Sequence, residues 1–261
     1  MSWPVPLVFV NGVPDGQVPA DDPAVTHGMA VFEVARTYND VPFRLDRHLG
    51  RLAGSAKFFG IPWRQALVEI EIAQALSASS GDRSVAITLT AGGLRIVRVA
   101  PIDLARVGTP VRLASCRWTP PSWLPGWVKH TARAPWLLAV RAAAVDEVLF
   151  VDDLGYWTEA SRSNLVVVRQ GHAQTPPDDG RILRGVTRGA LLDAAKEAGI
   201  QVVETPVLAG HCDELYVVST LKELAPVASL DGVNHVGPGP IGAALASAFH
   251  RLVQRETQEV G

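Results

Sequence analysis

The 261-residue sequence contains only two cysteines, Cys116 and Cys212, which stand far apart and lack the spacing of a metal site. We expect two reduced, structural thiols in a cytoplasmic protein, with no bound metal. No stretch approaches the roughly 18 apolar residues of a membrane span. Runs of Lys or Arg and an acidic tail are also missing, so we expect neither a nucleic acid nor a membrane as a partner.

The sequence also lacks internal repeats and low-complexity tracts, and the segment Met1–Pro6 has neither the basic start nor the long apolar run of a signal peptide. Its composition is that of an ordinary globular protein. The length suffices for one large domain or two modest ones with an ample core.

Alternating apolar residues in the first half predict strands, and helical spacing predicts two helices. The strands are expected at 7–10, 31–38, 41–45, 84–90, 96–99 and 111–116, and the helices at 47–59 and 64–78. Asp46 is a credible N-cap for the first helix, and residues 21–23 are expected to form a loop. Segment 119–126 holds three prolines and a glycine, which indicates a stiff connection.

The second half repeats this mixture of strands and helices. Strands are expected at 147–151, 156–159, 164–168, 201–204 and 214–219, and helices at 135–144, 188–198 and 241–253. We therefore predict an α+β or α/β protein with an N-terminal subdomain over 1–118, a linker over 119–126 and a C-terminal subdomain over 127–261.

Three features of the second half could serve one cofactor. Lys129 follows an apolar segment rich in Pro and Trp, Glu159 stands at a strand end, and Gly185–Thr187 directly precedes a helix. An amine, a carboxylate and an anion-binding helix start are the contacts that pyridoxal phosphate needs. The alternatives are a surface lysine, a Glu159 paired with Arg162, and an ordinary Thr187 N-cap.

Five segments in one order, over nearly the whole chain, resemble motifs of a known family. They are His27–Glu33 (HGMAVFE), Phe43–Leu52 (FRLDRHLGRL), Glu159–Leu165 (EASRSNL), Ile182–Arg188 (ILRGVTR) and Val218–Val227 (VSTLKELAPV). They are similar to the HYG-x-x-VFE, F-x-L-x-x-H-x-x-RL, EGS-x-x-N-[IL], IL-x-G-[IV]-TR and [TS]-[TS]-x-x-E-[IL]-x-PV motifs of fold-type IV pyridoxal-phosphate enzymes. That family of class IV aminotransferases includes branched-chain and D-amino acid aminotransferases and aminodeoxychorismate lyase.

The resemblance implies a homodimer whose chains each have an N-terminal α/β sandwich and a C-terminal pseudo-barrel, with pyridoxal 5'-phosphate between them. Lys129 matches the Schiff-base lysine, Glu159 the carboxylate at the pyridine nitrogen, and Leu183 the residue that backs the ring. The phosphate-binding positions of the motifs correspond to Arg51, Gly185, Val186, Thr187, Ser219 and Thr220.

Family membership does not decide the reaction, because both of its reaction types use the same lysine and ring contacts. Lys129-His130-x-x-Arg133 resembles some aminodeoxychorismate lyases, which eliminate pyruvate and give 4-aminobenzoate. The segment Ser219–Val227 is more similar to the D-amino acid aminotransferases. We expect an aminotransferase that moves an amino group between an amino acid or amine and a 2-keto acid, with the lyase as the alternative.

The substrate side departs from the family pattern. His27 stands where branched-chain enzymes usually have Tyr, and Arg133 stands where many relatives have a Tyr that contacts the cofactor oxygen. His27 and His130 could assist proton transfer, although a structural histidine is the commoner outcome.

Two further arginines, Arg36 and Arg162, could bind a substrate carboxylate through two parallel hydrogen bonds. Ion pairs with Glu33 or Glu159 are the alternatives. Strand alternation places Arg36 on the face opposite Glu33 unless a bulge intervenes.

Overall fold

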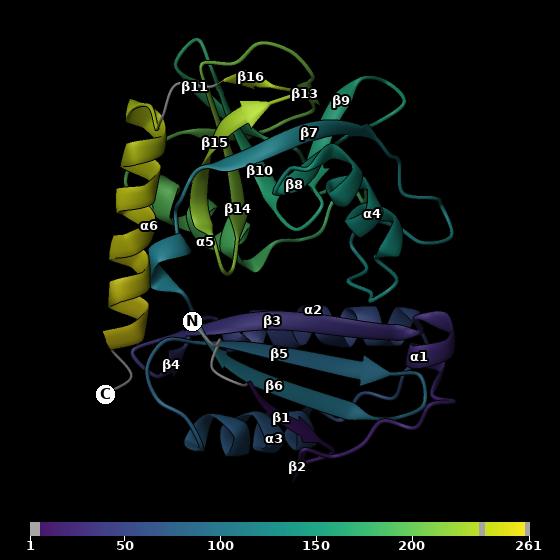
Figure 1. Ribbon diagram of the computed structural model, residues 1–261. Helices are drawn as coiled ribbons and strands as arrows, with labels where there is room; N and C mark the ends of the chain where they lie inside the picture. Colours follow the sequence, from purple (N-terminus) through teal and green to yellow (C-terminus); the bar gives the residue numbers. More distant parts are fainter. Residues whose placement is uncertain (1–5, 235–237, 259–261) are drawn as a thin grey trace. The chain divides into compact units, whose positions relative to one another are not determined.

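The computed structural model describes residues 6–234 and 238–258, so most of the Met1–Pro6 segment lies outside the described residues. The chain forms two compact units (Figure 1). Unit 1 comprises Met1–Asp103, Val128–Ala132 and Glu256–Gly261, and unit 2 comprises Leu104–Trp127 and Arg133–Arg255. The predicted linker, 119–126, falls in unit 2, whereas the Lys129 segment belongs to unit 1. The prediction of a mixed α+β fold is confirmed.

Unit 1 is a six-stranded antiparallel sheet in the order β2-β1-β6-β5-β3-β4. Its strands are β1 (Leu7–Val10), β2 (Val13–Pro14), β3 (Ala30–Tyr38), β4 (Val41–Pro42), β5 (Arg83–Thr90) and β6 (Arg95–Pro101). Its helices are α1 (Pro23–His27), α2 (Leu45–Phe58) and α3 (Gln65–Ser77). Alternation along β3 turns Val31, Glu33 and Ala35 to one face, and Val31 and Ala35 share a buried core with α2 and α3.

Two local predictions for unit 1 are wrong. Helix α2 begins at Leu45, its N-cap is Arg44 with a left-handed φ of 48°, and Asp46 already lies in its first turn. The Arg44 side chain does not cap the helix; it donates two hydrogen bonds to Glu256, 2.9 and 2.7 Å long. Residues 21–23 are not a simple loop, because Asp22 caps the short helix α1 and Pro23 occupies its first turn, where a missing N–H costs nothing.

Unit 2 is built on a ten-stranded curved sheet in the order β12-β11-β10-β14-β15-β7-β8-β9-β13, with β16 on β15 (Figure 1). Its strands are β7 (Val111–Arg117), β8 (Glu147–Val151), β9 (Tyr156–Ala160), β10 (Asn164–Arg169), β11 (His172–Thr175), β12 (Val202–Glu204), β13 (Val207–Leu208), β14 (Glu214–Ser219), β15 (Glu223–Leu230) and β16 (Val233–Asn234). Its helices are η1 (Leu104–Arg106), α4 (Ala134–Ala143), α5 (Val186–Glu197) and α6 (Pro240–Gln258). Strand β7 runs parallel to both neighbours, β15 and β8.

The sequence patterns missed β11 and β15. Strand β15 carries Pro226 opposite Tyr216 of β14, and proline normally argues against a strand interior because it has no N–H to donate. The strand forms here despite the proline, and its residues Glu223 to Val227 are all buried. No helix in the described parts of the chain is long and apolar enough to cross a membrane.

Helix α6 begins against the buried carboxylate of Glu214. That carboxylate accepts hydrogen bonds from the N–H groups of Ile241 (3.1 Å) and Gly242 (2.8 Å) and from the Tyr216 hydroxyl (2.5 Å). Burial raises the pKa of Tyr216, so its hydroxyl stays a donor. A side chain at position 242 would overlap the Tyr216 ring, which explains the glycine in the first helical turn.

We expect Gly242→Ala to lower the free energy of unfolding by about 1–3 kcal/mol, because the added methyl group overpacks a closed site. Denaturant titration of both proteins measures the difference. Gly54→Ala is the matched control, because Gly54 lies inside α2 with open space around it. The control should be neutral or more stable by up to about 1 kcal/mol. Equal shifts in the two variants would contradict the overpacking argument.

Candidate active site

Lys129 is fixed in unit 1 through its backbone. Its N–H donates to the Ser55 hydroxyl of α2 (3.1 Å), and its carbonyl accepts from the Phe32 N–H of β3 (3.1 Å). The Lys129 Nζ lies 4.6 Å from the centre of the Phe32 ring. Ser55 is completely buried, so the polypeptide on which the amine stands is anchored to two elements of the core.

Arg51 lies beside this lysine segment and is bound to a buried carboxylate. Glu33 is fully buried and accepts from Arg51 Nε (2.5 Å) and Nη2 (2.8 Å), while His48 Nδ1 lies 2.8 Å from the same carboxylate. His48 and Arg51 are three residues apart on α2, which puts both on one helix face toward β3. We call Glu33, His48 and Arg51 the α2 charge cluster.

The pKa values of Glu33 and His48 in the α2 charge cluster are both shifted from their ordinary values. Burial alone would raise the pKa of Glu33, but Arg51 and His48 outweigh it and hold that pKa well below its usual range. Burial lowers the pKa of His48, Glu33 opposes this, and the positive charges of Arg51 and Lys129 lower it further. Glu33 is therefore ionised at neutral pH and His48 favours its neutral form.

Arg36 lies on the opposite face of β3 from Glu33, as the alternation predicted. The register between β3 and β5 continues without a shift from Ala30 to Arg36, so no bulge intervenes. Arg36 is 2% exposed and forms an ion pair with Asp82 (3.0 Å). The alternative of an ion pair with Glu33 is wrong, and the Asp82 pair favours a structural role for this arginine.

The two candidate histidines of unit 1 differ in environment. His27 is exposed at the end of α1, with its Nδ1 2.7 Å from the Thr26 hydroxyl. His130 is buried and its ring stacks on Phe59 with centroids 6.2 Å apart. The His130 position is that of a packed core residue.

In unit 2 the carboxylate of Glu159 is oriented by neutral donors. Its Oε2 accepts from the Leu183 N–H (3.0 Å) and from Asn164 Nδ2 (3.2 Å). The same Asn164 amide also donates to the Leu183 carbonyl (2.9 Å). The sequence motif contains Asn164 but did not indicate its role, which is to bind both the Glu159 carboxylate and the Leu183 backbone.

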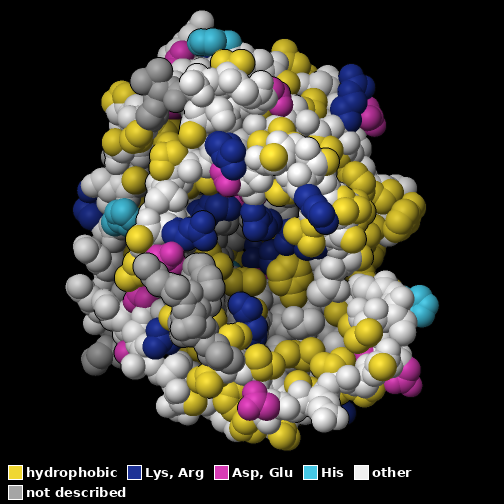
Figure 2. Space-filling view, viewed as in Figure 1, with side chains coloured by type: hydrophobic (Ala, Val, Ile, Leu, Met, Phe, Trp, Pro, Cys, Tyr) yellow, Lys and Arg dark blue, Asp and Glu magenta, His cyan; other side chains and the backbone are white. Residues whose placement is uncertain are grey.

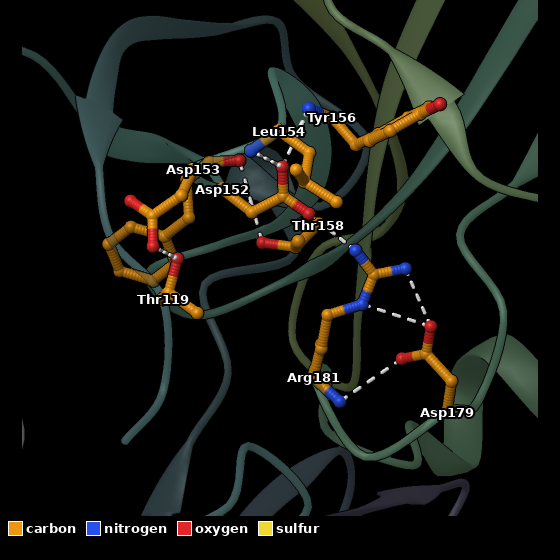
Figure 3. Close-up of polar contacts among 9 residues, drawn as sticks. Thr119, Asp152, Asp153, Leu154, Tyr156, Thr158, Asp179 and Arg181 are labelled. Carbon is orange, nitrogen blue, oxygen red and sulfur yellow. Dashed lines mark hydrogen bonds and ion pairs between the residues drawn. The ribbon is translucent and has the colours of Figure 1, made fainter. Parts of the chain in front are cut away.

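The segment before Leu183 is anchored by ion pairs (Figure 3). Asp152, buried directly after β8, accepts from the N–H groups of Leu154 (3.0 Å) and Tyr156 (2.8 Å) and from the guanidinium of Arg181. Arg181 also binds Asp179 (2.6 Å), and this hydrogen bond lowers the pKa of Asp179. Arg181 thereby ties the segment that carries Leu183 to the strand pair that carries Glu159.

The start of α5 has the features of an anion site. Its N-cap is Gly185, with no side-chain cap in the described structure, so Thr187 is not the N-cap. The first helical N–H groups have no intrahelical partner, and this helix end is positive. The hydroxyls of Thr187 and Thr220 lie 3.4 Å apart. A side chain at position 185 would overlap the Asn164 amide, so the close backbone approach requires glycine.

Arg133 and Arg162 are the remaining substrate candidates. Arg133 is the N-cap of α4 and donates to the carbonyl of Ser161. Arg162 is exposed, and its guanidinium donates to the Asp146 carbonyl (2.5 Å) while its N–H donates to Glu147 (2.8 Å). The described bonds of Arg162 thus lead away from Glu159, against the alternative of a direct pair.

Residues 30–230 match the sequence profile of the amino-transferase class IV family. The chain belongs to this family. A class IV aminotransferase is a pyridoxal-phosphate-dependent transaminase, so the predicted family, enzyme class and cofactor are confirmed. The residues present fit that cofactor, since α5 offers an anion cradle and Glu159 an oriented carboxylate.

Curated relatives of this class IV aminotransferase cover nearly its whole length. The putative branched-chain-amino-acid aminotransferase of Methanocaldococcus jannaschii is 29% identical over 93% of this chain and 94% of its own. The D-alanine aminotransferase of Bacillus licheniformis is 27% identical over 92% and 93%. The branched-chain aminotransferase of Thermoproteus uzoniensis, solved with norvaline, superposes with a TM-score of 0.85 at 25% identity, covering 97% of both chains.

Proposed function

We propose that this class IV aminotransferase moves an amino group between an amino acid and a 2-keto acid, with Lys129 holding pyridoxal phosphate as a Schiff base. The observation that carries the proposal is the setting of Lys129. Its backbone is fixed on both sides and its amine stands beside the α2 charge cluster.

When bound, the cofactor supplies an electron sink that stabilises negative charge at the substrate Cα. Lys129 would be the proton carrier: its amine would accept the proton from the substrate Cα and deliver it to the acceptor carbon that the cofactor supplies. Glu159, held by Asn164 and Leu183, would face the pyridine nitrogen and favour its protonated form. Backbone and hydroxyl donors and one guanidinium would bind the cofactor phosphate. The residues proposed for this are Arg51, Gly185, Val186, Thr187, Ser219 and Thr220.

Transamination is favoured over pyruvate elimination by the names of the relatives. Branched-chain aminotransferases and a D-alanine aminotransferase are among the relatives reported above. The lyase remains the second candidate because Lys129, His130 and Arg133 reproduce a pattern of some lyases. Branched-chain and D-amino acids are therefore the first donors to test.

We also propose a homodimer and a cytoplasmic location. Exposed apolar side chains on unit 2 support the dimer: Trp123 is 75% exposed, and Leu137 and Leu138 on α4 are 59% and 62% exposed. The free thiols of Cys116 and Cys212 support a reducing compartment. Light scattering measures the assembly state directly.

The purified protein with added pyridoxal phosphate should be yellow, with an absorption band of the bound cofactor. Adding D- and L-forms of alanine, leucine, valine and glutamate, one at a time, should convert that band to the amine form with at least one of them. A colourless protein after cofactor addition would refute the cofactor assignment. Pyruvate release from aminodeoxychorismate, with no conversion by any donor, would favour the lyase instead.

A further inference from the structure

We propose that the guanidinium of Arg133 and the hydroxyl of Ser161 bind the carboxylate of the substrate. The substrate class is then amino acids and 2-keto acids, and not amines without a carboxylate. This inference rests on the proposed transamination and names its donor class. It also selects one arginine among the three candidates, Arg36, Arg133 and Arg162.

The first observation is a buried hydroxyl without a partner. Ser161 is 5% exposed, and its Oγ makes no hydrogen bond within the described part of the chain. A hydroxyl removed from water without a partner costs free energy, and such groups in folded proteins call for an explanation. Ser161 follows Glu159 by two residues, so this donor is close in sequence to the carboxylate assigned to the cofactor ring. A carboxylate oxygen of a bound substrate would satisfy it.

The second observation is the cation next to this hydroxyl. Arg133 donates to the carbonyl of Ser161 itself, so both groups belong to one small region of unit 2. A guanidinium carries five N–H donors in a planar fork that matches a carboxylate. Burial lowers the pKa of Arg133, Glu159 and Glu147 oppose this, and Arg162 adds to it. A substrate carboxylate would add the negative charge that this partly buried cation favours.

Arg133 is close to the reactive Lys129 in sequence and interacts electrostatically with Glu159. Arg133 follows Lys129 by four residues, and four residues span at most about 14 Å when fully extended. The charge of Glu159 acts on Arg133 directly. A carboxylate bound at Arg133 would therefore belong to a molecule near Glu159, the carboxylate assigned to the cofactor ring.

Other cations are engaged elsewhere. Arg36 is paired with Asp82 on the far face of β3 from Glu33, and Arg162 donates outward to Asp146. Lys222 forms an ion pair with Glu147, a fully buried carboxylate that also accepts from the Ser163 hydroxyl (2.8 Å). Figure 2 shows several Lys and Arg side chains, in dark blue, on this face of the molecule, and positive side chains attract an anionic substrate.

The test compares two donors in cofactor-loaded protein: the fastest amino acid of the panel, and the amine that remains when its carboxyl group is removed. Single-turnover conversion of the cofactor band gives a rate constant for each. Arg133→Gln should lower kcat/KM for the amino acid roughly 10- to 100-fold, the value of a charged hydrogen-bonded contact. The rate with the amine should change by less than about 3-fold. Ser161→Ala should lower the amino acid rate in the same direction by a smaller factor.

Arg162→Gln is the matched control, since it removes the same charge close by and should leave the ratio of the two rates unchanged. Should Arg133→Gln lose the cofactor band, Arg133→Lys and Ser161→Ala carry the test. An equal loss for both donors in every variant, or a changed ratio in Arg162→Gln alone, would overturn the proposal. If the wild-type protein binds the cofactor but converts no amino acid, the proposed transamination is refuted. If it converts amino acids but the variants do not change the ratio of the two rates, only the carboxylate-binding role of Arg133 and Ser161 is refuted.

Discussion

Lys129→Ala should lower kcat of transamination by about 10,000-fold, the upper end of what a positioned acid–base group contributes. The loss should be this large because one amine serves as both the covalent anchor and the proton carrier, and no other lysine takes its place. Borohydride reduction followed by peptide mass spectrometry checks the anchor. The wild-type peptide with Lys129 should gain the mass of the reduced cofactor, and the variant should carry no label.

Lys57→Ala is the control for this experiment. Lys57 lies exposed in the last turn of α2, in the same unit as Lys129. Its removal should leave the label, the absorption band and kcat unchanged. Label on another lysine in the Lys129→Ala protein, with activity retained, would show that the wrong lysine has been assigned.

The motif residues could be predicted from the sequence because their roles depend on local structure. Gly185 precedes a helix and Glu159 ends a strand, and both can be placed from periodicity and turn residues alone. The resemblance then placed Lys129 and Arg51 by order along the chain. The structure confirms the elements that carry these residues, although it places Gly185 at the N-cap of α5 and Arg44 at that of α2.

The partners of these residues were not predictable in the same way. Glu33 lies 18 residues from Arg51 and 15 from His48, so the cluster requires the packing of α2 on β3. Arg36 shows the same limit. Alternation gave its correct face, but its partner Asp82 is 46 residues away and is brought close by the turn before β5. The strand face on which a side chain lies follows from the local sequence pattern. The partner in an ion pair follows from how distant segments pack in the folded protein.

Glu33→Gln should lower the free energy of unfolding at pH 7 by about 3–5 kcal/mol, the cost of leaving a buried charge without its partner. The amide keeps the shape of the side chain but removes the negative charge that faces Arg51 and His48. Arg51 is only 10% exposed, so water cannot replace the lost carboxylate fully. Because Arg51 is also proposed to bind the cofactor phosphate, the variant should hold pyridoxal phosphate more weakly. Glu69→Gln, at an exposed carboxylate on α3, is the control and should have little effect.

The pH dependence separates the charge of Glu33 from its shape. The pKa of Glu33 is lower in the folded protein than the ordinary value of 4.5. Its contribution is therefore fully present above about pH 4.5 and is lost as the pH falls toward the folded pKa. Glu33→Gln lacks this term, so the stability difference between the two proteins should narrow below about pH 4.5. Burial lowers the pKa of His48, so wild-type stability should also decline as the pH falls below 6.5. Denaturant titrations at pH 7, 5 and 4 measure both effects. A difference that stays constant over this range would mean that the ionised carboxylate does not stabilise the cluster.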